Sequence, residues 1–190
     1  RDGSSPEFYQ CSFSGNVADF GGGCYLKSES NPIMENVTFN GNSATNSGGG
    51  IVLKDDANLQ ANTLFIVDND AEGLGGGLYV NNADPELSYI LIADNSASSG
   101  GGAYFRNPSN PSLTNASIVN NTADLYGNGI YMRDGVDVTV LNSILWSNNE
   151  AQVYFRSEGN SVTLNISYSD IEYGEDGIID NDNGNLNWGE

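Results

Sequence analysis

One asparagine recurs along this chain with a period of about 26 residues, and that repeat constrains its fold more than any other feature. The asparagines at this position are Asn16, Asn42, Asn69, Asn95, Asn121 and Asn148. An apolar residue precedes each of them by three positions, and glycines cluster after the first four, at 21–23, 48–50, 75–77 and 100–102. A unit this short cannot bury its own apolar side chains, so successive units must stack on one another.

Each repeat contains short segments in which apolar and polar residues alternate, such as 33–39 and 51–54, and this period of two predicts β-strands. Strands of successive repeats then pair in parallel, about 4.8 Å apart, around a common core. The asparagine fits a left-handed turn and can stack into an amide ladder, and the glycines mark a bend that lies too close to the next coil for a side chain. We therefore predict an all-β, right-handed parallel β-helix, a solenoid of about seven coils with roughly 26 residues per coil.

We expect residues 1–190 to form a single β-helix domain, with regular coils over 1–158 and a degenerate last coil and cap over 159–190. In that last coil, Ile166 and Ile171 match inward positions. Cys11 and Cys24 fall where other repeats carry mostly apolar residues, so they form either buried thiols or a disulfide. The chain opens close to a repeat unit, which predicts a piece of a longer protein with flanking domains.

The charge of the chain limits its partners. Its 25 acidic and 6 basic residues give a net charge of −19, and such a surface repels phosphate groups. We therefore expect no nucleic acid partner and no binding to anionic membranes. No stretch approaches the roughly 20 apolar residues of a membrane span. The chain contains no histidine, which excludes Ser–His–Asp, Cys–His and histidine–metal chemistry.

Two short motifs carry a resemblance to a known family. Phe13-Ser-Gly-Asn16 and Phe39-Asn-Gly-Asn42 match a Phe-x-x-Asn signature. A Gly-Gly-Ala-(Ile/Val/Leu) signature is matched in part by Gly49-Gly50-Ile51, Gly76-Gly77-Leu78 and Gly101-Gly102-Ala103. Over about residues 5–158 the chain thus resembles the repeats of the polymorphic outer-membrane adhesins of chlamydiae and, more loosely, secreted bacterial β-helix repeat proteins. The resemblance implies an extracellular or cell-surface location and an adhesive role.

The strand after the glycines predicts a surface, because alternate side chains leave the core. One outward column consists of Tyr25, Val52, Tyr79, Tyr104, Tyr131 and Tyr154. The next consists of Lys27, Lys54, Asn81, Arg106, Arg133 and Arg156, which include five of the six basic residues. Tyrosine rings stack on sugars and guanidinium groups bind carboxylates or sulfates. We therefore predict an acidic polysaccharide site at Tyr79, Tyr104, Tyr131, Tyr154, Arg106, Arg133 and Arg156.

A structural interpretation of the same columns stays open. Stacked tyrosines stabilise neighbouring coils, and the basic residues balance acidic neighbours such as Asp55, Glu29, Asp134 and Glu158. A second outward surface precedes the asparagine, and it consists of Phe65, Val67, Tyr89, Leu91, Ala93, Ile144 and Trp146. The contacts with a partner are expected from Phe65, Val67, Leu91, Ile144 and Trp146. Exposed apolar area of this size predicts a protein interface, with a covering loop or another copy of the chain as alternatives.

Candidate catalytic and metal-binding residues are few. Asp68 and Asp94 occupy equivalent places on adjacent coils, where they can share a calcium ion or simply form turns. We expect no other cofactor. Hydrolases of this fold use a larger cluster of aspartates, and lyases combine calcium carboxylates with an Arg or Lys base. The sequence shows neither cluster, because tyrosines flank Arg106, Arg133 and Arg156.

We therefore predict a non-catalytic binding or adhesion module whose partner is a polysaccharide or a host or cell-surface protein. Two alternatives remain. One is a polysaccharide lyase-like enzyme or a glycoside hydrolase of the β-helix class. The other is a structural spacer or protein-interaction segment, which explains the repeats equally well because stacking alone demands regular coils.

Overall fold

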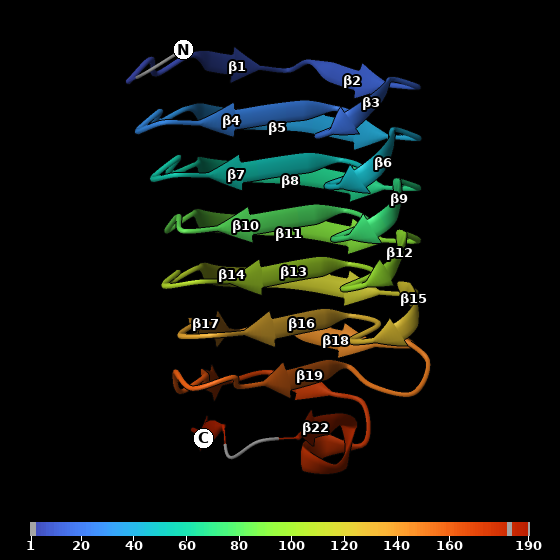
Figure 1. Ribbon diagram of the computed structural model, residues 1–190, viewed down its shortest axis with the longest axis vertical. Helices are drawn as coiled ribbons and strands as arrows, with labels where there is room; N and C mark the ends of the chain where they lie inside the picture. Colours follow the sequence, from blue (N-terminus) through green and yellow to red (C-terminus); the bar gives the residue numbers. More distant parts are fainter. Residues whose placement is uncertain (1–2, 182–183, 190) are drawn as a thin grey trace.

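The computed structural model describes residues 3–181 and 184–189. Across these residues the chain winds through three parallel sheets, which we call A, B and C (Figure 1). A full coil passes through sheet A, then B, then C, and strands of successive coils pair in parallel. The described part contains no α-helix and no helix long and apolar enough to cross a membrane. This architecture confirms the predicted parallel β-solenoid.

The described strands divide among the sheets as follows. Sheet A contains β1 (Glu7–Tyr9), β2 (Ser12–Ser14), β5 (Ile33–Asn40), β8 (Gln60–Val67), β11 (Glu86–Ala93), β14 (Ser112–Val119), β17 (Asp137–Leu141), β18 (Ile144–Trp146), β20 (Thr163–Ser167), β21 (Asp170–Ile171) and β23 (Asn185–Trp188). Sheet B contains β3 (Val17–Phe20), β6 (Ser43–Ser47), β9 (Asp70–Leu74), β12 (Ser96–Ser99) and β15 (Thr122–Tyr126). Sheet C contains β4 (Cys24–Lys27), β7 (Ile51–Lys54), β10 (Leu78–Asn81), β13 (Ala103–Arg106), β16 (Ile130–Arg133), β19 (Val153–Arg156) and β22 (Ile178–Asp180). A 3₁₀ helix, η1 (Gly174–Gly177), precedes β22.

The core lies between the sheets and runs along the whole stack. Alternate residues of the sheet C strands point into it, as Ile51 and Leu53 do on β7. They pack against inward residues of sheet A, such as Ile66 on β8. Ile166 and Ile171 belong to the same buried cluster, so the last coil continues the core as predicted.

The recurring asparagines form a continuous ladder of hydrogen bonds. The Nδ2 of each asparagine donates to the Oδ1 of the asparagine one coil further on, over 2.8–3.0 Å. The ladder ends where Asn148 donates to the Oε1 of Gln152 and Gln152 donates to Glu172. The ladder confirms the prediction, and Gln152 takes the place of the asparagine that the last repeat lacks.

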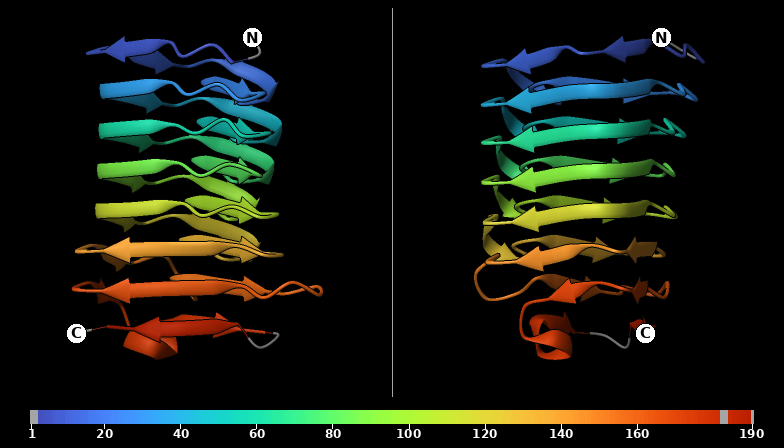
Figure 2. Two further views of the ribbon diagram at one scale, coloured as in Figure 1. Left: turned by 90° about the vertical axis from the view of Figure 1, so that its left-hand side faces the viewer. Right: turned by 180° about the vertical axis from the view of Figure 1, so that it is seen from behind.

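The glycine clusters lie where coils approach most closely. A Cβ added at Gly22, Gly49, Gly76 or Gly101 would lie 2.2–2.4 Å from a carbonyl oxygen of the next strand in sheet B. The corresponding residue one coil later is Asn128. Its side chain has room because sheet B ends at β15, so no further strand of this sheet lies next to it. Nine positions separate Asn121 from Ile130, but five separate Asn148 from Val153, so the next coil passes directly from sheet A to sheet C. Figure 2 shows sheets A and C continuing below this point.

The two cysteines do not bond to each other. Cys11 and Cys24 are free thiols, half-buried against the core. Burial raises the pKa of Cys24 to about 11. Of the two alternatives that the sequence leaves open, a disulfide or free thiols, the structure shows the free thiols.

Candidate functional site

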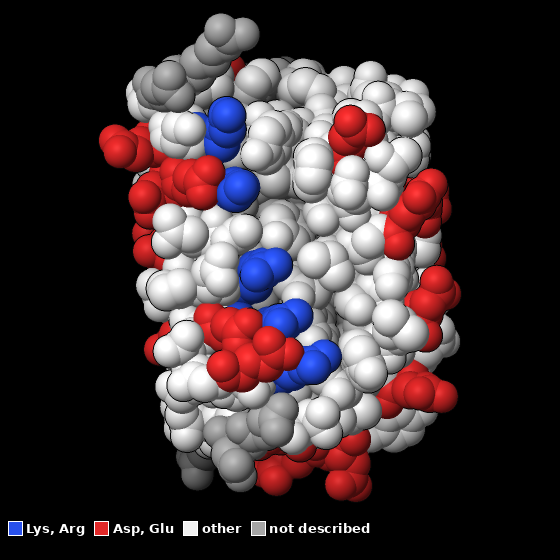
Figure 3. Space-filling view, viewed as in Figure 1, with Lys and Arg blue, Asp and Glu red and all other residues white. Residues whose placement is uncertain are grey.

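The outer face of sheet C carries the predicted basic column. The strand register places one member on each coil, in the order Lys27, Lys54, Asn81, Arg106, Arg133 and Arg156. Figure 3 shows the basic side chains as a column down this face, with carboxylates on both sides of it. The predicted alignment of five of the six basic residues is therefore confirmed.

The tyrosines beside this column form a closed stack. Ring centroids are 5.6 Å apart for Tyr79 and Tyr104, 4.7 Å for Tyr104 and Tyr131, and 5.4 Å for Tyr131 and Tyr154. The stack is separate from the main core, so these side chains do point outward, yet each residue is 8% exposed or less. The expectation of an exposed aromatic surface is wrong, because the rings cover one another. Their faces are therefore not free to stack on a sugar.

Two of the buried phenols interact by hydrogen bonds with guanidinium groups of the basic column. Burial raises the pKa of Tyr104, while a hydrogen bond from Arg133 opposes that rise. Burial raises the pKa of Tyr131 to about 12, again against a hydrogen bond from an arginine, Arg156. Two arginines of the column are thus anchored on the tyrosine stack.

Carboxylates neutralise the two arginines at the C-terminal end of the basic column. The Nε of Arg133 lies 2.9 Å from the Oδ2 of Asp134, and both Arg133 and Arg156 pair with Glu158. These contacts agree with the structural interpretation of the basic residues. Arg106 differs: it has no ion-pair partner among the described residues, and its buried Nε has no hydrogen-bond partner there.

The predicted calcium ligands lie in exposed turns. Asp68 and Asp94 have φ angles of 55° and 56°, and Gly41 and Asn120 adopt the same left-handed conformation at the equivalent positions. Glycine, asparagine and aspartate tolerate this conformation better than other residues. Across residues 3–181 and 184–189, no group of three or more Cys, Asp or Glu side chains could hold a metal ion. The turn explains both aspartates, and a shared calcium ion stays a hypothesis.

The outer face of sheet A contains the predicted apolar surface. The register aligns Phe65, Leu91 and Ile144 in one column, and Val67 and Trp146 in the next. Phe65, Ile144 and Trp146 are exposed as expected. Val67 and Leu91 are half-buried and Ala93 is buried, because they lie within the sheet between residues of the coils on either side. The exposed part of this surface therefore consists mainly of Phe65, Tyr89, Ile144 and Trp146.

Two exposed tyrosines of this face have an unusual backbone. One residue in the middle of each sheet A segment has a φ between 50° and 58°, and these residues are Gln10, Asn36, Thr63, Tyr89, Asn115, Asn142 and Tyr168. Asparagine suits this conformation, whereas a bulky tyrosine there costs about 1 kcal/mol or more. Tyr89 and Tyr168 are nevertheless 59% and 73% exposed. Sequence reasoning missed Tyr168; the asparagines at the equivalent positions were the available signal.

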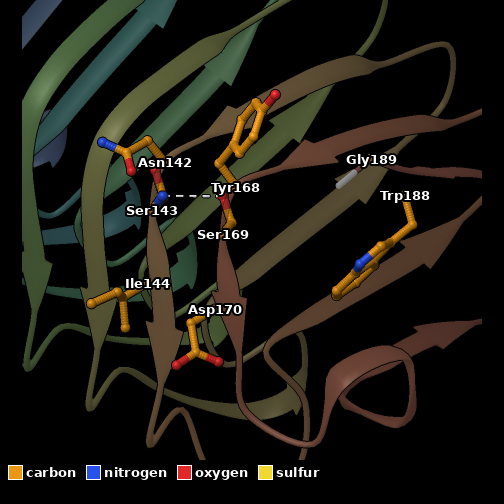
Figure 4. A pocket seen from close by; sticks show the side chains of 8 residues that line it. All are labelled: Asn142, Ser143, Ile144, Tyr168, Ser169, Asp170, Trp188 and Gly189. Atoms are coloured by element: carbon orange, nitrogen blue, oxygen red, sulfur yellow. Dashed lines mark hydrogen bonds between the residues drawn. The ribbon is translucent and has the colours of Figure 1, made fainter.

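A groove lies at the C-terminal end of the same face. It has a volume of about 460 Å³ and is lined by Asn142, Ser143, Ile144, Tyr168, Ser169, Asp170, Trp188 and Gly189 (Figure 4). Beside it, the backbone N–H of Ser143 donates to the Oγ of Ser169 over 3.0 Å, which ties two coils together. The groove thus combines the exposed rings of Tyr168 and Trp188 with the carboxylate of Asp170.

Comparisons with known proteins agree with this architecture. The profile of the right handed beta helix region matches residues 60–188, and that of the Chlamydia polymorphic membrane protein repeat matches residues 36–54. No curated protein and no solved structure gives a significant match. Because the first profile covers more than half of the chain, the chain belongs to the right-handed β-helix family.

Proposed function

We propose that this protein is a non-catalytic adhesion module, located at a cell surface or outside the cell, that binds a partner protein through the outer face of sheet A. The match of residues 36–54 to a repeat of chlamydial membrane proteins supports the location. The observation that carries the binding surface is the backbone of Tyr89 and Tyr168. Both expose a large ring from a conformation that disfavours it.

A strained and exposed aromatic residue contributes little to the fold. Neither ring belongs to a buried cluster, so packing does not explain why tyrosine stands where the other coils carry mostly asparagine. Residues held in costly backbone conformations cluster at functional sites. Tyrosine and tryptophan are also enriched at the centres of protein interfaces. Binding to a partner therefore accounts for these two tyrosines better than folding does.

The composition of the face favours a protein over a sugar. Phe65, Ile144 and Trp146 are exposed on it, and the side chains of Phe65 and Ile144 offer no hydrogen bonds to hydroxyl groups. The exposed carboxylates of Asp68 and Asp94 follow β8 and β11 at the margin of the face. A partner that fits would place apolar residues at its centre and basic residues toward its rim.

Acidic polysaccharide on the basic column is the second candidate. Arg106 favours it, because a cation without an ion-pair partner among the described residues, in a chain of charge −19, can still bind an external anion. The sugar would then meet the column through its carboxylate or sulfate groups, since the tyrosine faces are covered.

Binding to intact cells distinguishes the two candidates. Fluorescently labelled protein is incubated with a panel of cultured animal and bacterial cells, before and after treatment of the cells with protease or with glycosidases. We expect binding that protease abolishes and that the double variant Tyr89→Asn, Tyr168→Asn loses at least tenfold. The matched control, Arg106→Gln, should bind as the unmodified protein does.

The opposite pattern supports the second candidate. Loss of binding after glycosidase treatment and in Arg106→Gln, with full binding by the tyrosine variant, would contradict the sheet A proposal. Affinity electrophoresis against neutral, carboxylated and sulfated polysaccharides then identifies the glycan class. If the protein binds no cell and no glycan, the adhesion proposal is wrong and the spacer alternative gains support.

A further inference from the structure

The early end of sheet B leaves two backbone donors without partners among the described residues. Upstream, the amides of Gly100 and Gly101 donate to the carbonyl oxygens of Tyr126 and Gly127, over 3.0 and 3.2 Å. The equivalent amides belong to Gly127 and Asn128, and no carbonyl of the described residues accepts from either of them. Both residues are buried. A buried amide without a partner costs about 1–3 kcal/mol, so this edge favours an external acceptor.

The side chain of Asn128 takes the place of one hydrogen-bond acceptor that a further strand of sheet B would supply. Its Oδ1 accepts a hydrogen bond of 2.6 Å from the backbone N–H of Ala123 on β15. In the coils above, a glycine at this position leaves room for the next strand of sheet B. The side chain of Asn128 therefore caps the first part of the β15 edge, and the part toward Tyr126 stays open.

A groove adjoins the open part of this edge. Its volume is about 820 Å³, and it is lined by Ala123, Asp124, Leu125, Tyr126, Gly127, Asn128, Asn149, Glu150, Ala151, Tyr154, Tyr173 and Ile179. Its walls include the exposed apolar side chains of Leu125, Tyr126 and Ile179. Asp124 and Glu150 are exposed carboxylates, and the groove lining includes no basic residue.

We propose that this groove binds an extended, basic segment of a partner protein, which adds to β15 as the next strand of sheet B. Main-chain carbonyls of the segment accept from Gly127 and Asn128, as in other cases of strand addition to a sheet edge. An apolar side chain packs against Tyr126 and Ile179, and a lysine or arginine pairs with Asp124 or Glu150. The strands of sheet B contain four or five residues, which sets the length of the segment.

This site is independent of the proposed contact surface on sheet A. None of its lining residues lies on a sheet A strand. Variants at Tyr89 or Tyr168 should therefore leave it unchanged, and its failure would not affect the adhesion proposal.

Short synthetic peptides test the proposal by nuclear magnetic resonance. The probe is acetyl-Lys-Val-Lys-Val-Lys-amide, and the charge-reversed control replaces each lysine with glutamate. We expect the lysine peptide to shift the amide signals of Leu125, Gly127 and Asn128. The glutamate peptide should bind at least tenfold more weakly, and so should the lysine peptide to the variant Asp124→Asn, Glu150→Gln.

Two further measurements test the strand itself. A lysine peptide methylated on alternate backbone nitrogens cannot pair along the edge, and it should not bind. Inserting Ser-Ala-Ser-Ser after Asn148, together with Asn128→Gly, should fill sheet B with the chain's own residues and abolish binding. The methylated peptide leaves the protein unaltered, so it decides the question if the insertion variant fails to fold.

Three outcomes would overturn the proposal. Equal binding of the methylated and unmethylated peptides would mean that charge alone attracts them. Absence of amide shifts at Gly127 and Asn128 at millimolar peptide would remove the site. Concentration-dependent dimerisation that the charge variant abolishes would show that a second copy of this chain occupies the groove.

Discussion

Tyrosines occur on the outside of two sheets of this protein, and their surroundings are opposite. Tyr104 and Tyr131 lie in an unbroken column of sheet C, where each ring packs on another and is almost fully buried. Tyr89 and Tyr168 lie alone on sheet A, in a column otherwise of mostly polar residues, and both are largely exposed. Alternation along a strand decides which side of the sheet a residue occupies. The residues one coil above and below decide whether water reaches it.

The difference also separates structural from functional aromatic residues. The sheet C stack forms a second apolar cluster, and its hydroxyls support arginines, so each ring contributes to stability. The sheet A tyrosines stand in left-handed backbone and pack in neither buried cluster. Removing a ring of the first set should therefore lower the free energy of unfolding strongly, whereas removing a ring of the second set should change it little.

Truncation of a stacked ring should give the largest effect. Tyr104→Ala removes a residue that is 1% exposed, and we expect a loss of about 3–5 kcal/mol in the free energy of unfolding because a cavity remains between two rings. Urea denaturation followed by circular dichroism measures it. Tyr89→Ala is the matched control and should change stability by less than about 0.5 kcal/mol. Similar losses in both variants would mean that exposure does not separate the two sets.

Alkaline pH should destabilise the stacked set selectively. The pKa of Tyr131 is raised to about 12 from an ordinary value of 10, so between these pH values the unfolded chain releases a proton that the folded chain retains. Stability should therefore fall as pH rises through this window, by at most about 1.4 kcal/mol per pH unit for this group. Cys24 contributes in the same direction, between pH 9 and 11.

Denaturation midpoints measured from pH 8 to pH 12 show this effect. Tyr131→Phe should flatten the alkaline slope, because phenylalanine cannot ionise. An identical slope in Tyr131→Phe and the unmodified protein would contradict the assignment of the raised pKa to burial in the stack.

The sequence predicts the coil geometry well, because each position repeats six times. The asparagine ladder, the inward residues of sheet C and the basic column all follow from positions that recur every 23 to 27 residues. The end of sheet B was also visible, as a shorter interval between Asn148 and Val153 and as Asn128 in place of a glycine. Both signals are departures from the repeat, and their meaning depends on knowing which strand the missing residues would form.

The candidate site was less predictable for two physical reasons. Alternation places Tyr104 outside the sheet, but it does not reveal that neighbouring rings bury it. The φ angle of a residue is likewise not visible in a single repeat, so Tyr89 reads as an ordinary strand residue. Packing between coils and backbone strain therefore required the three-dimensional structure.

The smallest effect should have the opposite sign to the others. Tyr89→Asn places asparagine in a left-handed conformation that asparagine tolerates, so we expect stability to rise by about 0.5–1 kcal/mol, measured as an increase in the urea midpoint. Phe65→Asn is the matched control, because Phe65 is an exposed ring of the same face without a positive φ, and this variant should gain nothing. A variant that is more stable but binds cells less would show that Tyr89 serves recognition at the expense of the fold. A loss of stability in Tyr89→Asn would instead mean that the ring contributes to packing, and the distinction between the two sets of tyrosines would fail.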